Sequence, residues 1–206
     1  MRLWLALALA AGLAALLAPG ALAHDRALPP ATAQAAAQGA GAALPFPIEI
    51  RPRFALIDQT GRAVTEAHFA GRPMAIFFGY ANCQAICPVA LSSLAAALDL
   101  LGPEGAEIVP ILITIDPARD TPAAMARRLA QYHPRLIGLT GSEAALAEAR
   151  AIFQVETSQV AETPEGAPLY AHGGFIYLVG RDGVVKSLLP PILSPQRIAE
   201  LMRKYL

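Results

Sequence analysis

The chain has 206 residues, and its 16 lysines and arginines balance 16 aspartates and glutamates, so the formal net charge is zero. Such a balance creates no field that would attract a nucleic acid or an anionic membrane surface, and we expect no nucleic-acid partner. The 55% apolar composition includes an almost continuously apolar leader. The rest has the composition of an ordinary globular protein.

The leader, residues 1–23 (MRLWLALALAAGLAALLAPGALA), has the features of an export signal. An early arginine precedes a Leu/Ala run, and an Ala-Leu-Ala end follows the helix-breaking Pro19-Gly20 pair, which is typical of a cleavage site. The alternative is an uncleaved membrane anchor, since the run falls only slightly short of the roughly 20 apolar residues that span a bilayer. We therefore expect a periplasmic protein, either soluble after cleavage or tethered to the inner membrane.

Two further segments follow the leader. Residues 24–44 consist mainly of Ala, Gln, Gly and Pro, which cannot bury enough apolar surface to fold, so we interpret them as a flexible tether. Residues 45–206 have a length of roughly 160 residues, which suits one domain.

The apolar pattern of residues 45–206 alternates between strands and helices. Strands are predicted in FALIDQTGRAV, PMAIFFGY, IVPILITID and RLIGLTG, helices in PVALSSLAAALDLL, TPAAMARRLAQY and SEAALAEARAIFQV, a hairpin around Asp182-Gly183, and a closing helix from Ser194-Pro195 to Leu206. Thr121 and Ser142 are expected to cap their helices. This order predicts an α/β fold with a mixed central sheet and helices on both faces.

Both cysteines, Cys83 and Cys87, lie in GYANCQAICPVAL, between the apolar strand PMAIFFGY and the helix after it. A reactive loop between a central strand and a helix is the arrangement of a thioredoxin-like fold. Thiolates are favoured near a helix N-terminus, where backbone N–H groups point outward. Because Pro88 suits a first helical position, we expect Cys87 at the cap, and Val89 on one broad apolar face with Leu91, Leu94, Leu98 and Leu101.

The CxxxC spacing permits two kinds of chemistry. In a regular helix, side chains four apart have Cβ atoms about 5–6 Å from each other, whereas a disulfide needs roughly 3.5–4.5 Å. A disulfide therefore requires some distortion, and two thiolates set slightly apart can instead bind a soft metal ion such as Cu(I) or Zn(II). The alternative is that both cysteines are small packed apolar residues.

Four histidines are candidates for a further ligand: His24, His68, His133 and His172. His68 and His133 lie in turn-like segments, where a structural role is usual. His24 would become the N-terminal residue after cleavage, and its amine and imidazole could chelate Cu(II). His172 is the strongest candidate, because in a thioredoxin-like fold the loop before the hairpin strand faces the active-site loop, and Gly173 and Gly174 would allow close backbone approach there.

In order and spacing, the segments IFFGYANCQAICPVAL, ITIDPARDTPAAM, IGLTG and AHGGFIYLV resemble those of the Sco/SenC family, over essentially all of residues 46–206. The resemblance implies an exported thioredoxin-like protein that carries copper to the binuclear copper centre of cytochrome c oxidase. It implies a Cu(I)/Cu(II) site on Cys83, Cys87 and His172, and in some members thiol-disulfide reductase activity. The copper-receiving oxidase subunit is then the expected partner, with another copper carrier or a thiol-disulfide reductant as further partners.

Two departures from the family pattern each remove a carboxylate near the site. Gln84-Ala85 stands where relatives usually have Pro-Asp, and Ala171 stands where they usually have Asp before the histidine. Because such outer partners are typically worth 10–100-fold in metal affinity, we expect weaker copper binding or a different recipient. For the Asp116–Pro122 turn, a structural role with Arg119 and Asp120 as a surface pair is the favoured interpretation.

Three functions compete for this sequence. The first is a copper chaperone, which is not an enzyme. The second is a periplasmic thiol-disulfide oxidoreductase in which Cys83 or Cys87 attacks a disulfide and the other thiol resolves the mixed disulfide. A common CxxC motif would favour the second, and its absence favours the first. A peroxiredoxin-like peroxidase is the third, but no Thr-x-x-Cys arrangement precedes Cys83.

Overall fold

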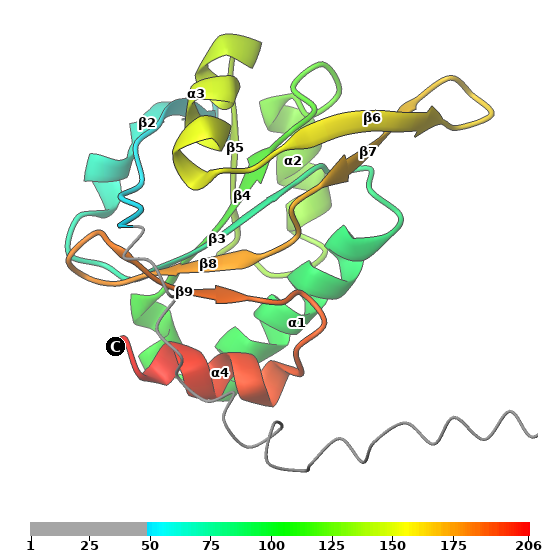
Figure 1. Ribbon diagram of the computed structural model, residues 1–206. Helices are drawn as coiled ribbons and strands as arrows, with labels where there is room; N and C mark the ends of the chain where they lie inside the picture. The colour runs from blue at the N-terminus through cyan, green and yellow to red at the C-terminus, as the bar shows by residue number, and fades with distance from the viewer. Residues whose placement is uncertain (1–48) are drawn as a thin grey trace, which may run out of the picture. The chain divides into compact units, whose positions relative to one another are not determined.

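The computed structural model describes residues 49–206, which form a seven-stranded sheet in the order β2-β1-β5-β4-β3-β8-β9 and a separate two-stranded sheet, β6-β7 (Figure 1). The predicted leader 1–23 and tether 24–44 lie outside the described residues, and so does His24. Among the helices of residues 49–206, none is both long enough and apolar enough to cross a membrane.

The centre of the large sheet is built from the most apolar segments of the sequence. The strands β3 (Met74–Gly79) and β4 (Val109–Thr114) run parallel, and all their residues are buried. Strand β8 (Ile176–Val179), also wholly buried, pairs antiparallel with β3. An apolar run without alternation is what a strand covered on both faces requires, so the predicted buried strands are confirmed.

The outer strands complete a mixed sheet. Strand β5 (Ile137–Thr140) is parallel to β4 and antiparallel to β1 (Ala55–Asp58), whose hairpin partner is β2 (Ala63–Thr65). On the other side, β9 (Val185–Leu189) pairs with β8 across the predicted hairpin, where Gly183 has a positive φ of 70°. The predicted α/β class with a mixed central sheet is confirmed.

Four α-helices cover the two faces of this sheet (Figure 1). Helices α1 and α4 pack together on one face, and α2 and α3 cover the other. Their bounds are α1 Ile86–Leu101, α2 Pro122–Leu129, α3 Glu143–Phe153 and α4 Pro195–Arg203, and two short 3-10 helices, η1 and η2, span Glu66–Phe69 and Glu104–Glu107. Thr121 and Ser142 accept hydrogen bonds from Ala124 and Ala145, so both predicted caps are confirmed.

The prediction for α1 was correct in its buried face and wrong at two details. Leu91, Leu94, Leu98 and Leu101 are buried, but Val89 is 46% exposed and lies off that face. The helix begins at Ile86 with Ala85 as its N-cap. Cys87 therefore lies inside the first turn and not at the cap, because a proline in the third helical position needs no hydrogen-bond partner for its missing N–H.

The ribbon of β6 (Thr157–Glu162) and β7 (Pro168–His172) was missed by the sequence analysis. Most of β6 is exposed, and its composition is polar, so the alternating apolar pattern that marks a strand is absent. The ribbon is antiparallel with an irregularity between Gln159 and Ala161, and it extends away from the large sheet (Figure 1). Its last residue is His172, which had been expected in a loop.

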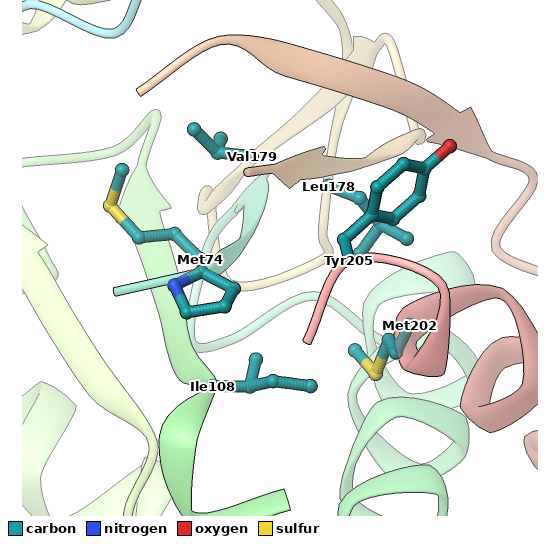
Figure 2. A pocket seen from close by; sticks show the side chains of 7 residues that line it. Met74, Ile108, Leu178, Val179, Met202 and Tyr205 are labelled. Atoms are coloured by element: carbon teal, nitrogen blue, oxygen red, sulfur yellow. The ribbon is translucent and has the colours of Figure 1, made fainter. Parts of the chain in front are cut away.

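Beyond α4, the chain end closes one side of the core. Figure 2 shows Met74, Ile108, Met202 and Tyr205 around a cavity of about 10 Å³. That volume is about enough for one water molecule. The space is therefore a packing defect that is too small for a larger ligand.

Candidate metal centre

The cysteine loop is formed where β3 leaves the sheet. After Gly79 the chain turns, with the Cys83 N–H donating to the Tyr80 carbonyl at 3.1 Å, and α1 begins three residues later. Cys83 precedes the helix and Cys87 lies in its first turn, so both sulfurs are close to unpaired N–H groups of the helix terminus. Both cysteines are free and buried, with 3% and 2% exposure.

His172 reaches this loop from the end of β7. Its Nε2 lies 3.9 Å from the Sγ of Cys87. Its Nδ1 lies 3.0 Å from the Gly173 carbonyl oxygen. A carbonyl only accepts hydrogen bonds, so Nδ1 carries the proton and the lone pair of Nε2 faces Cys87. This is the tautomer in which an imidazole binds a metal ion through Nε2.

The two thiols share a proton unequally. The pKa of Cys83 is lowered, chiefly because the Cys87 thiol donates a hydrogen bond to the Cys83 thiolate; burial opposes this shift, and nearby backbone amides add to it. The pKa of Cys87 is raised, first by the same hydrogen bond and then by burial. The two opposite shifts favour the thiolate at Cys83 and the thiol at Cys87.

Aromatic rings surround the histidine. The His172 ring lies 6.2 Å from the rings of Phe77 and Tyr80, measured between centroids, in edge-to-face arrangements. Tyr170, two residues earlier on β7, packs edge-to-face on Tyr80 at 5.4 Å. These contacts shield one side of the site from water and restrict rotation of the imidazole.

A buried carboxylate supports the loop from behind. Asp120 is fully buried, and its Oδ2 accepts hydrogen bonds from the Ala81 N–H at 2.9 Å and the Thr114 hydroxyl at 2.6 Å. Its Oδ1 is buried without a partner among the described residues. Burial raises the pKa of Asp120, against the effect of these hydrogen bonds. Arg128 Nε donates to the carbonyl of the same residue, Ala81, at 3.0 Å, so both backbone groups of Ala81 are held by side chains.

The expected surface pair of Arg119 and Asp120 is wrong. Arg119 forms its ion pair with Asp116, whose side chain is only 2% exposed, while Asp120 points to the cysteine loop. Asp120 and Arg128 were thus not predicted as supports of the loop. The signal was the Asp116–Pro122 segment itself, which was interpreted as a strand end and helix cap alone.

The other described histidines have structural roles. His68 lies in η1, where its Nδ1 accepts the N–H of Thr65, the N-cap residue, at 3.0 Å. His133 is 9% exposed, and its Nδ1 accepts the Arg135 N–H at 3.1 Å. Neither lies in the cysteine loop or in β7, so of the described histidines His172 is the one brought to the thiols. The expectation of close approach at Gly173 is wrong, since a Cβ built there would meet nothing within 4 Å.

The candidate metal ligands lie near one another but do not form a preorganised metal site. Among residues 49–206, no group of three His, Cys, Asp or Glu side chains stands ready to hold a metal. A groove of about 310 Å³ lies elsewhere among these residues: it touches Met74, at the start of β3, and its lining includes Arg51, Arg53, Arg72 and Arg181. The cysteine loop follows the opposite end of β3.

A strand-to-helix loop with two thiols, facing a histidine from a separate ribbon, defines a thioredoxin-like protein with a candidate sulfur and imidazole site. This chain belongs to the SCO1/SenC family, whose model matches residues 42–206. The zebrafish (Danio rerio) mitochondrial SCO2 homolog is 35% identical over 155 residues, which are 74% of this chain and 56% of that protein. This chain therefore spans little more than half the length of that relative.

Two solved structures are also similar. Bradyrhizobium japonicum ScoI, solved with copper bound, matches with a TM-score of 0.71 and 36% identity, over 76% of this chain and 99% of that chain. BsSco, described with a disulfide switch and as a member of the Sco family of cytochrome c oxidase assembly proteins, matches with a TM-score of 0.59 and 25% identity, over 76% of this chain and 92% of that chain. Both likenesses support the thioredoxin-like fold.

Proposed function

We propose that this chain is an exported copper-binding protein that delivers copper to the binuclear copper centre of a respiratory cytochrome c oxidase. Cys83, Cys87 and His172 are the proposed ligands, and copper is the cargo. The observation that carries the proposal is the 3.9 Å approach of His172 Nε2 to Cys87 Sγ, with the Nε2 lone pair turned to the sulfur. The copper-receiving oxidase subunit is the proposed partner, in the periplasm.

The donor set fits copper. Thiolates select soft ions such as Cu(I), and imidazole binds either copper oxidation state. The separation of 3.9 Å between nitrogen and sulfur is shorter than the sum of a typical metal–thiolate and metal–imidazole bond, about 4.3 Å. One ion can therefore contact both atoms, with Cys83 as the third donor after a small shift of the loop.

The protonation states of the two thiols favour copper binding at this site. The lowered pKa of Cys83 favours its thiolate in the metal-free protein, because Cys87 donates to it. Cys87 still carries its proton, which it must lose to become a ligand, so copper binding releases a proton. Delivery then proceeds by exchange of these ligands for those of the recipient. The copper-bound structure of ScoI, and the membership of BsSco in the Sco family of cytochrome c oxidase assembly proteins, support this proposal.

Copper retention tests the proposal. The reduced protein is loaded with Cu(I) or Cu(II), challenged with a competing chelator, and compared with Cys83→Ser, Cys87→Ser and His172→Ala. We expect about one copper per chain, lost in both cysteine variants and weakened in the histidine variant. His68→Ala is the matched control, because its imidazole lies outside the site. Equal retention in all variants would contradict the proposed ligands.

A second candidate, a thiol-disulfide oxidoreductase, is favoured by the unequal protonation of the two thiols. The Cys83 thiolate would attack a disulfide of an exported protein, forming a mixed disulfide and releasing one substrate thiolate. Cys87, after losing its proton, would then attack the Cys83 sulfur, releasing the second substrate thiol. The chain would end with a Cys83–Cys87 disulfide, and the substrate would gain two electrons.

Exchange with a disulfide peptide separates the two functions. A copper chaperone retains one copper and reduces the peptide slowly, because both sulfurs are buried. Rapid stoichiometric reduction by a chain that retains no copper would favour the oxidoreductase. His172→Ala distinguishes them further, since it should weaken copper retention without removing either thiol.

A further inference from the structure

The turn between β4 and α2 contacts both halves of the proposed site. On one side, Asp120 accepts the Ala81 N–H at 2.9 Å and so holds the cysteine loop. On the other side, Arg119 Nη2 donates to the Pro168 carbonyl at 2.8 Å and so holds β7. Neighbouring residues of one turn thus hold the segment that carries the thiols and the strand that carries the histidine.

Strand β7 needs such a support because the large sheet does not hold it. Its ladder partner is β6 alone, in a two-stranded sheet. An isolated two-stranded ribbon is marginally stable in water. The hydrogen bonds of the large sheet therefore do not fix the distance between His172 and Cys87. The ribbon is placed by side-chain contacts, among them the packing of Tyr170 and His172 on Tyr80.

The Arg119 side chain makes the two directed contacts that this support requires. Its Nε forms a hydrogen-bonded ion pair with Asp116, a carboxylate with 2% exposure, while Nη2 reaches the Pro168 carbonyl. The guanidinium also lies 5.9 Å from the ring centroid of Tyr80. A planar guanidinium can donate in two fixed directions at once, which a lysine ammonium on its flexible stem does not reproduce.

We infer that Arg119 is a positioning residue for the metal site: it links buried Asp116 to the Pro168 carbonyl and thereby keeps His172 in contact with the cysteine loop. The inference rests on the proposed function for its copper readout. It adds a residue that contacts none of the three proposed ligands. Because the hydrogen bond from Arg119 Nη2 goes to the histidine strand, losing it should resemble losing the imidazole and leave both thiols in the chain.

The test uses Arg119→Lys in the full chain, since lysine keeps the positive charge beside Asp116 and protects the fold. We expect copper affinity to fall on the order of 10-fold, which is typical when a residue that orients a metal ligand is replaced. The nitrogen hyperfine coupling in the electron paramagnetic resonance spectrum of the Cu(II)-loaded protein should also weaken. In the His172→Ala background, Arg119→Lys should add little. Arg62→Lys is the matched control, because Arg62 pairs at 3.3 Å with Asp58, a carboxylate of 7% exposure, at another place in the fold.

A metal-free measurement separates this inference from the proposed function. In the reduced, copper-free chain, Arg119→Lys should speed hydrogen exchange of the β6–β7 amides, and Arg62→Lys should not. Unchanged exchange in the ribbon, or a copper loss that adds fully to that of His172→Ala, would overturn the inference. Copper retention that never depends on His172 would overturn the proposed ligand set, and the exchange result would still decide the role of Arg119.

Discussion

His172 Nε2 lies 3.9 Å from Cys87 Sγ, although the two residues are 85 positions apart in the chain. The cysteine belongs to the first turn of α1 and the histidine ends β7, a strand outside the large sheet. The contact therefore depends on how two separately folded segments are held together.

Gly79 sets the distance between β3 and Cys87. A Cβ built on Gly79 would lie 2.9 Å from the Phe77 ring and 3.0 Å from Cys87 Sγ. We expect Gly79→Ala to destabilise the fold by about 1–3 kcal/mol through overpacking, and to lower copper retention by pushing the sulfur away. Urea unfolding and chelator competition measure the two effects. Gly173→Ala, where a Cβ meets nothing within 4 Å, is the control and should leave both unchanged.

Cys87 keeps Cys83 ionised. The Cys87 thiol donates to the Cys83 thiolate and lowers the pKa of Cys83. In the reduced, copper-free protein, thiolate absorbance should therefore persist around pH 6, well below the ordinary cysteine pKa of about 8.5. Cys87→Ala removes the donor, so the pKa of Cys83 should rise and the absorbance at that pH should fall. The same titration curve in both proteins would contradict the hydrogen bond.

Asp120 supports the cysteine loop, but burial disfavours the charged form of its carboxylate. Asp120→Ala leaves the Ala81 N–H and the Thr114 hydroxyl without their acceptor, at about 1–3 kcal/mol for each buried group left unpaired. Burial raises the pKa of Asp120, so the folded state binds its proton more tightly than the unfolded state.

The contribution of Asp120 to stability should therefore be greatest below about pH 4 and decrease as the pH rises through the raised pKa. Asp120→Asn removes the charge and should flatten this dependence, as urea unfolding across that range would measure. A steeper dependence in the Asn variant would contradict the assignment.

Asp58 stabilises the turn after β1 in the opposite pH sense. Burial alone would raise its pKa, but the Thr60 hydroxyl, the N–H groups of Thr60 and Arg62, and the Arg62 guanidinium together lower it. A lowered pKa gives stability that is present above the unfolded pKa of about 4 and lost as the pH falls through the folded value. Asp58→Asn should cost about 1–3 kcal/mol at neutral pH, and the cost should shrink below about pH 4.

Thermal or urea unfolding of the unchanged protein and of Asp58→Asn, each at neutral and at acidic pH, checks this prediction. Asp182→Asn is the control: Asp182 also has a lowered pKa, chiefly through Lys186, but it is exposed to solvent, which screens the interaction. A cost for Asp58→Asn that persists unchanged in acid would show that shape and not charge is what matters at this position.

The order of elements in the large sheet could be predicted because its signals are local. Uninterrupted apolar runs gave β3 and β4, Thr121 and Ser142 marked the starts of α2 and α3, and Asp182-Gly183 marked the last hairpin. The ribbon β6–β7 could not be predicted, because its exposed polar strands bury little apolar surface and so leave no periodic pattern.

The sequence by itself determined the chemistry of this protein: two thiols at a strand-to-helix junction and one histidine with glycines after it. The tertiary structure alone decided how these groups are held. It placed Asp120 and Arg128 against the N–H and the carbonyl of Ala81, paired Arg119 with Asp116 instead of Asp120, and made His172 the end of a strand. Residue types fix which atoms can bind or ionise, whereas hydrogen bonds between distant segments depend on where the folded chain brings them together.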